Sequence, residues 1–154
     1  MLLDIIQLEG PVTSTRAFKA YINNSPLSRL TILVEETLKR ATSKLESENK
    51  IKILRYEDKD INYAVDTLYT PSSDLKQIRE LGSRSFDEVP ICELAEFIQI
   101  LKSSQSLQVN DEQIYRNILG AYGLVRLTNQ TRNQFERANQ FKWIKSNPSL
   151  FLSA

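Results

Sequence analysis

The side chains with which most enzymes do chemistry are scarce in this chain of 154 residues. Histidine is absent, which removes the commonest general base and the usual partner of a serine or cysteine nucleophile. The single cysteine, Cys92, lies where a helix is predicted to begin, and a buried, inert thiol is favoured there over a reactive one. The glycines match neither the P-loop nor the dinucleotide-binding pattern. The sequence therefore predicts a protein that is not an enzyme and needs no cofactor.

Acidic residues do not supply a metal site either. Glu93 and Glu96 are three residues apart on a predicted helix and share a face, with Glu88 a short distance before them. No third ligand is spaced to join the pair, and the aspartates between residues 58 and 66 lack the spacing of a nuclease centre. We therefore interpret the three glutamates as surface residues that favour solubility, and we predict no bound metal.

Basic residues are concentrated in the last part of the chain. The whole chain carries a net charge of only +1, so bulk charge does not attract nucleic acid. Residues 113–154, however, hold six basic residues against Glu136 alone, a net charge of +5. Polar side chains on the last predicted helix are of the types that contact phosphates and base edges. The DNA-binding candidates are Arg116, Arg126, Arg132, Gln134, Arg137 and Lys142.

Each charged or aromatic cluster also has a plainer explanation. The C-terminal basic residues equally fit the solvated face of a last helix, near whose end basic residues are favoured by the helix dipole. A second basic group on the long helix of the first half has glutamates among it, so exposed ion pairs are favoured there. The last aromatic residues most simply pack the tail onto the core, or else form an exposed patch. The partner-docking candidates are Phe141, Trp143 and Phe151.

Helical periodicity and stop signals predict three helices in the first half. The first ends at Gly10-Pro11, the second begins after Thr13, and the third begins after Ser28. The third helix has the clearest apolar face. The residues on that face are Leu30, Leu33, Val34, Leu38, Ala41 and Leu45.

Two runs rich in β-branched and aromatic residues, 51–56 and 61–69, follow these helices and predict a β-hairpin. Three helices followed by a hairpin is the order of a winged helix, in which a β-ribbon flanks the third helix of a helix-turn-helix. The sequence therefore predicts a mainly α fold with a small β-hairpin, beginning with a winged-helix-like three-helix unit at residues 1–70.

A connector rich in turn-forming residues is predicted at 71–88, followed by a second three-helix, helix-turn-helix-like unit at 89–147 and a tail at 148–154. In this unit Pro90 lies near the start of the first helix. Asn110 is the predicted cap of the second, in a capping box with Gln113, and Gly123 ends that helix. Thr128 caps the third.

Four segments together resemble a known domain. They are Gly10-Pro11-Val12, the helix start at Ser28, Glu88-Val89-Pro90 followed by Glu93-Leu94, and above all residues 116–128. The pattern is similar to an uncharacterised domain that typically forms the C-terminal end of large bacterial superfamily 1 helicase-like or nuclease-associated proteins. That domain usually has a Leu-Gly-Phe turn followed by Arg, whereas this chain has a longer turn at residues 119–123. The resemblance implies an accessory DNA-associated module, either detached or the remnant of a longer protein, with motor and nuclease chemistry elsewhere.

Composition and these patterns leave two hypotheses. A lone cysteine, no secretion signal and no membrane-spanning run of apolar residues predict a reducing, cytoplasmic location without membrane contact. The first hypothesis is an accessory DNA-binding module. The alternative is a protein-interaction module that docks to a helicase or nuclease partner, or to itself, through residues 141–152 without touching DNA.

Overall fold

The computed structural model describes residues 1–56, 65–104 and 109–141. The fold is mainly helical with a small antiparallel sheet, as predicted. The chain divides into two compact units. The first comprises Met1–Arg55 and Val65–Leu75, and the second comprises Tyr56–Ala64 and Lys76–Ala154.

The first unit begins with α1 (Leu2–Glu9) and α2 (Ser14–Asn23), whose predicted limits are confirmed. The Gly10 amide donates to the Ile6 carbonyl oxygen at 2.8 Å and closes α1. A Cβ atom at Gly10 would collide with that same oxygen, so only glycine fits this helix end. The Thr13 hydroxyl accepts a hydrogen bond from the Arg16 amide at 3.3 Å and caps α2, as its position predicted.

The third helix, α3 (Ile32–Ser47), begins later than predicted. Thr31, not Ser28, is its cap, and the Thr31 hydroxyl accepts from the Val34 amide at 3.2 Å. The prediction that Leu33 faces the core is also wrong, since this side chain is 72% exposed. Leu33 comes one residue before Val34, which lies on the inner face, and is therefore turned about 100° away from that face.

The hairpin is confirmed but is shorter than predicted. Strand β2 (Lys52–Leu54) pairs antiparallel with β3 (Thr67–Tyr69), and Ile53 lies opposite Leu68. The sheet also has a third strand, β1 (Val12–Thr13), which pairs with β3 and gives the order β1-β3-β2. A strand of two residues is too short to show the alternation of apolar and polar residues that indicates a strand. The sequence therefore did not predict it. The predicted hairpin residues 57–64 lie outside the described residues.

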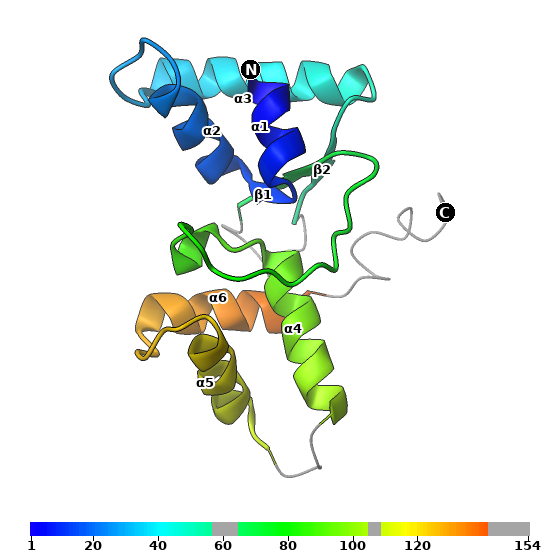
Figure 1. The fold of residues 1–154 in the computed structure, drawn as a ribbon, viewed down its shortest axis with the longest axis vertical. Helices are drawn as coiled ribbons and strands as arrows, with labels where there is room; N and C mark the ends of the chain where they lie inside the picture. Colours follow the sequence, from blue (N-terminus) through cyan, green and yellow to red (C-terminus); the bar gives the residue numbers. More distant parts are fainter. Residues whose placement is uncertain (57–64, 105–108, 142–154) are drawn as a thin grey trace. The chain divides into compact units, whose positions relative to one another are not determined.

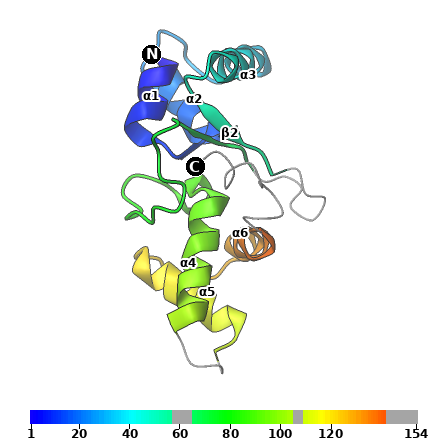
Figure 2. The ribbon, with the colours of Figure 1, turned by 90° about the vertical axis from the view of Figure 1, so that its right-hand side faces the viewer.

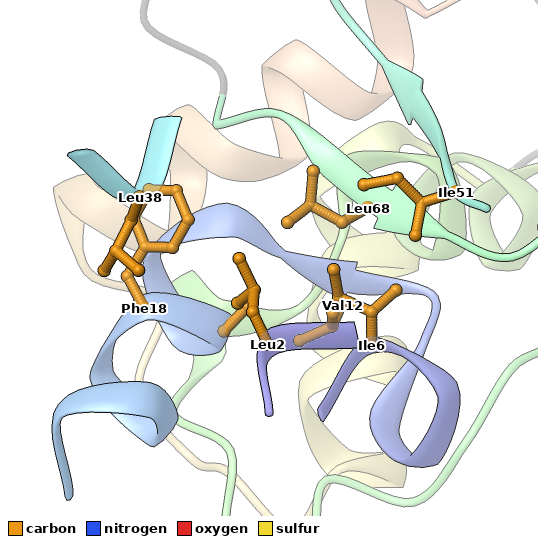
Figure 3. Close-up of a cluster of buried hydrophobic side chains, with 8 residues drawn as sticks. Leu2, Ile6, Val12, Phe18, Leu38, Ile51 and Leu68 are labelled. Atoms are coloured by element: carbon orange, nitrogen blue, oxygen red, sulfur yellow. The ribbon is translucent and has the colours of Figure 1, made fainter. Parts of the chain in front are cut away.

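The core of the first unit is built from every one of its helices and from its sheet. In Figures 1 and 2, α3 lies across α1 and α2. Figure 3 shows how side chains from α1, α2, α3 and the strands gather in one apolar cluster. The buried members are Leu2, Ile6, Val12, Ala17, Phe18, Leu38, Ile51 and Leu68.

The second unit contains α4 (Ile91–Ser104), α5 (Asp111–Ala121) and α6 (Asn129–Gln140), as the sequence predicted. α4 packs against both other helices, and α6 lies across it (Figures 1 and 2). Asn110 and Thr128 cap α5 and α6 as predicted. The capping box predicted at Asn110 lacks its second arm, because the Gln113 side chain donates to Asn117.

Gly123 ends α5, as predicted. It has a positive φ of 76°, which favours glycine, and its amide donates to Gly120 while the next amide donates to Leu119. Residues 122–128 then connect α5 to α6. This connection is longer than the roughly three- to four-residue turn of a helix-turn-helix.

Aromatic rings fill the core of the second unit. Tyr115 on α5 stacks on Phe135 of α6, with ring centroids 4.5 Å apart. Phe86 contacts the rings of Phe135 and Tyr122, and Phe97 meets Tyr122 edge-on. Offset or edge-on ring pairs of this kind contribute beyond the apolar area that they bury.

The segment predicted as a connector, 71–88, belongs in part to each unit. Residues up to Leu75 group with the first unit, and residues from Lys76 group with the second. The second part contains the short 3-10 helix η2 (Phe86–Glu88), which is closed by a capping box between Ser85 and Glu88. This part of the segment is therefore folded into the second unit.

Candidate nucleic-acid interface

The outer surface of α6 is polar over its whole length. Only Phe135 and Ala138 of this helix are buried. Arg132, Gln134 and Arg137, all predicted to bind DNA, lie on α6 and are half-buried. The exposed residues are Asn129, Gln130, Asn133, Glu136 and Gln140.

Two of the candidates on α6 bind each other. The Arg137 Nη1 donates to the Gln134 side-chain oxygen at 2.8 Å. This contact joins residues three apart on one helix and holds both side chains along the helix surface. Among the described residues, the other donors of this guanidinium have no side-chain partner.

Arg116 on α5 and Arg132 on α6 come together at one acidic residue. The Oε1 atom of Glu112 lies 3.0 Å from the Nη2 of Arg116 and 3.8 Å from the Nη2 of Arg132. The sequence predicted both arginines as candidates but did not indicate that they share Glu112. The three side chains are between 38% and 51% exposed, so a ligand in solvent can reach them.

Arg126 lies in the connection between α5 and α6 and is exposed. Within the described residues it makes neither a side-chain hydrogen bond nor an ion pair. Its neighbour Val125 is also exposed, at 88%. The remaining candidate, Lys142, lies outside the described residues.

The described part of this surface carries less positive charge than the count over residues 113–154. α5, α6 and their connection contain four arginines and three acidic residues, Asp111, Glu112 and Glu136, which gives a net charge of +1. The count of +5 began at residue 113 and so left out two acidic residues on the same helix as Arg116, and it included Lys142 and Lys145, which lie outside the described residues. Any attraction to DNA at this surface is therefore local.

The partner-docking candidate that the structure describes, Phe141, is buried. Its side chain is 5% exposed and its ring meets that of Tyr56 edge-on at 5.5 Å. Phe141 thus packs in the core of the second unit and is not part of an exposed patch. Of the two interpretations of the last aromatic residues, packing onto the core holds for Phe141. Trp143 and Phe151 lie outside the described residues.

Basic residues of the first unit form ion pairs with glutamates, as favoured for its long helix. Lys39 pairs with Glu35 at 3.1 Å, one helical turn away, and this hydrogen bond raises the pKa of Lys39. Arg55 pairs with Glu46 at 2.8 Å and lowers the pKa of that carboxyl. These contacts satisfy their charges within the unit.

Glu93, predicted to be a surface residue, is instead 2% exposed, and that prediction is wrong. Its two oxygens accept four hydrogen bonds within the second unit. Oε1 accepts from Arg79 at 3.3 Å and from Arg84 at 3.1 Å. Oε2 accepts from Arg84 at 3.1 Å and from the Tyr122 hydroxyl at 2.8 Å. We call Glu93, Arg79, Arg84 and Tyr122 the Glu93 cluster.

Arg84 connects this cluster to the preceding loop. Besides the two bonds to Glu93, its guanidinium donates to the carbonyl oxygens of Arg79, Glu80 and Leu81 at 2.9 to 3.3 Å. One side chain thus ties three backbone carbonyls of the loop to α4. A loop without helix or strand needs such partners for its buried polar groups.

The Glu93 cluster is saturated and is suited to structure rather than chemistry. Both carboxylate oxygens are engaged by donors within the unit, so Glu93 is already bound by its neighbours. Burial raises the pKa of Tyr122 above its usual value, and the nearby Glu93 carboxylate raises it further. The tyrosine therefore stays a hydrogen-bond donor to Glu93.

The remaining reactive candidate, Cys92, is fully buried, as predicted. Its backbone amide donates to the Tyr56 hydroxyl at 3.3 Å. Among residues 1–56, 65–104 and 109–141, no three Cys, Asp or Glu side chains lie together in a way that would hold a metal ion. Across the same residues, no helix is both long and apolar enough to cross a membrane.

Comparisons of the chain with protein-family models, with curated proteins and with solved structures found no match.

Proposed function

We propose that this protein is a non-catalytic accessory DNA-binding module. The observation that carries the proposal is the polar outer surface of α6 together with Arg126 just before that helix, which is exposed and has no ion pair among the described residues. Side chains of these types bind phosphates and base edges. Because the local net charge is small, we expect weak, salt-sensitive binding with little sequence preference.

The proposal includes a winged-helix-like first unit. Its support is the order of elements, in which three helices precede the β2–β3 hairpin and β1 adds a third strand. In this proposal the hairpin is the wing, which contacts the nucleic-acid backbone beside a helix. The resemblance to a helicase-associated domain favours a bacterial helicase or nuclease system as the context and a cytoplasmic location.

A fluorescence-anisotropy titration of a labelled duplex tests the assignment of Arg126. Arg126→Ala is compared with Lys19→Ala, which removes one exposed positive charge from α2 in the first unit. We expect Arg126→Ala to weaken binding at low salt by roughly threefold to tenfold and to reduce the salt slope by about one. Equal affinities for the two variants would overturn the assignment.

A protein-interaction module, including one that associates with itself, is the second candidate. One observation favours it, namely that Ile32 and Leu33 at the start of α3 are 84% and 72% exposed. Exposed neighbouring apolar side chains are typical of contact surfaces. If the chain self-associates there, sedimentation velocity will show a dimer that the Ile32→Ser, Leu33→Ser variant lacks. A monomer at all concentrations would reject self-association through α3.

A further inference from the structure

The arrangement around Glu112 has the form of an anion site that is already filled. Arg116 approaches from the same helix, one turn later, while Arg132 approaches from α6. The Nη2 atoms of both guanidinium groups lie within ion-pair distance of the same oxygen, Oε1, and that of Arg116 also donates a hydrogen bond to it. An ion pair along one helix involves Arg116 alone, whereas Arg132 reaches the same carboxylate from a second helix.

Two guanidinium groups that flank one oxygen are well suited to bind a phosphate group. Guanidinium is planar, stays charged and offers paired donors to carboxylate and phosphate oxygens alike. A phosphate has more acceptor oxygens than a carboxylate and can engage both arginines at once. The three side chains are about half exposed, so the carboxylate can rotate away without unfolding either helix.

We propose that Glu112 occupies the position of a DNA backbone phosphate between Arg116 and Arg132, and that it limits the affinity for DNA by competing for these two arginines. The inference rests on the proposed DNA-binding function and deepens it. A bound phosphate displaces the Glu112 carboxylate, and the remaining repulsion between the two anions weakens the complex.

The experiment compares Glu112→Gln with Glu136→Gln in the same duplex titration at two salt concentrations. Each substitution removes one negative charge, and Glu136 is an exposed residue of α6 with no ion pair among the described residues. The control therefore measures the effect of net charge alone. Circular dichroism confirms that each variant keeps its helices.

We expect Glu112→Gln to strengthen binding at low salt by roughly threefold to tenfold, beyond any gain from Glu136→Gln, and to steepen the salt dependence. Adding Arg116→Ala and Arg132→Ala to Glu112→Gln should abolish this gain. Equal effects of the two glutamine variants would overturn the inference and leave the proposed function intact. Absence of binding by the wild type and by every variant would reject both.

Discussion

The two units are stabilised by different kinds of interior. Among the described residues, the buried positions of the first unit are apolar except for Thr13, Thr42 and Thr67. The second unit buries a carboxyl side chain, Glu93, and nearly buries the side chain of Arg84, which is 8% exposed. Strand pairing holds the non-helical chain in the first unit, whereas in the second unit Arg84 binds the carbonyl oxygens of residues 79–81.

This difference predicts different responses to mutation. An apolar core loses stability in proportion to the contacts removed. A buried ion pair adds little net stability, but removal of one partner is costly because the other charge stays buried and unpaired. The loss of stability caused by a substitution in each unit therefore distinguishes the apolar interior from the charged one. Hydrogen exchange can assign each loss to its unit.

Glu93→Ala should have the largest effect. It leaves Arg84 and Arg79 without their carboxylate, and we expect a loss of about 4 kcal/mol in the free energy of unfolding of the second unit. Chemical denaturation monitored by hydrogen exchange measures it. The matched control is Glu96→Ala, on the same helix but only half-buried. A loss below about 1 kcal/mol would contradict the role of the cluster.

Leu68→Ala is the corresponding change in the first unit. Leu68 is 1% exposed and lies on the central strand of the sheet, so its removal leaves a cavity. We expect a loss of roughly 3 kcal/mol. Reduced exchange protection should be confined to the first unit, and an equal loss of protection in α4 to α6 would show that the two units unfold together.

Tyr122→Phe should have a smaller effect, about 2 kcal/mol, because Glu93 keeps its arginine partners while losing one donor. Since the pKa of Tyr122 is raised in the folded protein, its contribution is complete below pH 10 and is lost as the pH rises further. The pKa of Tyr115 is raised as well, chiefly by burial. Denaturation curves between pH 8 and 11 should therefore show a weaker alkaline decline in Tyr122→Phe, and an unchanged decline would contradict the assignment.

Glu46→Gln should have the smallest effect. Its ion pair with Arg55 is more than one-third exposed on both sides, and we expect about 0.5 kcal/mol. The lowered pKa of Glu46 means that its contribution is present above the ordinary carboxyl pKa and is lost as the pH falls below it. A pH titration of the stability of both proteins checks this, and a loss comparable to that of Glu93→Ala would remove the distinction between surface and buried carboxylates.

The helices were predictable because their signals are local. The caps at Thr13, Asn110 and Thr128 and the stop at Gly123 each depend on residues within one turn. Strand β1 was not predictable because it is defined only by its partner β3, far along the chain. Glu93 was missed for the same reason, since its partners lie 9, 14 and 29 residues away.

The candidate interface was predictable in its residues but not in its electrostatics. The sequence placed Arg132, Gln134 and Arg137 on one helix, and the structure has them there. It did not indicate that Arg116 and Arg132 share Glu112, because that contact joins two helices. Net charge counted along the chain therefore overstated the positive character of the surface.

The most direct test of the central claim is an anisotropy titration of a labelled duplex and a single strand with the wild-type protein, at two salt concentrations about fourfold apart. We expect weak binding at low salt that falls steeply at the higher concentration, with a slope that counts the phosphate contacts. No binding at low salt would contradict the DNA-binding function and make the protein-interaction module the leading candidate.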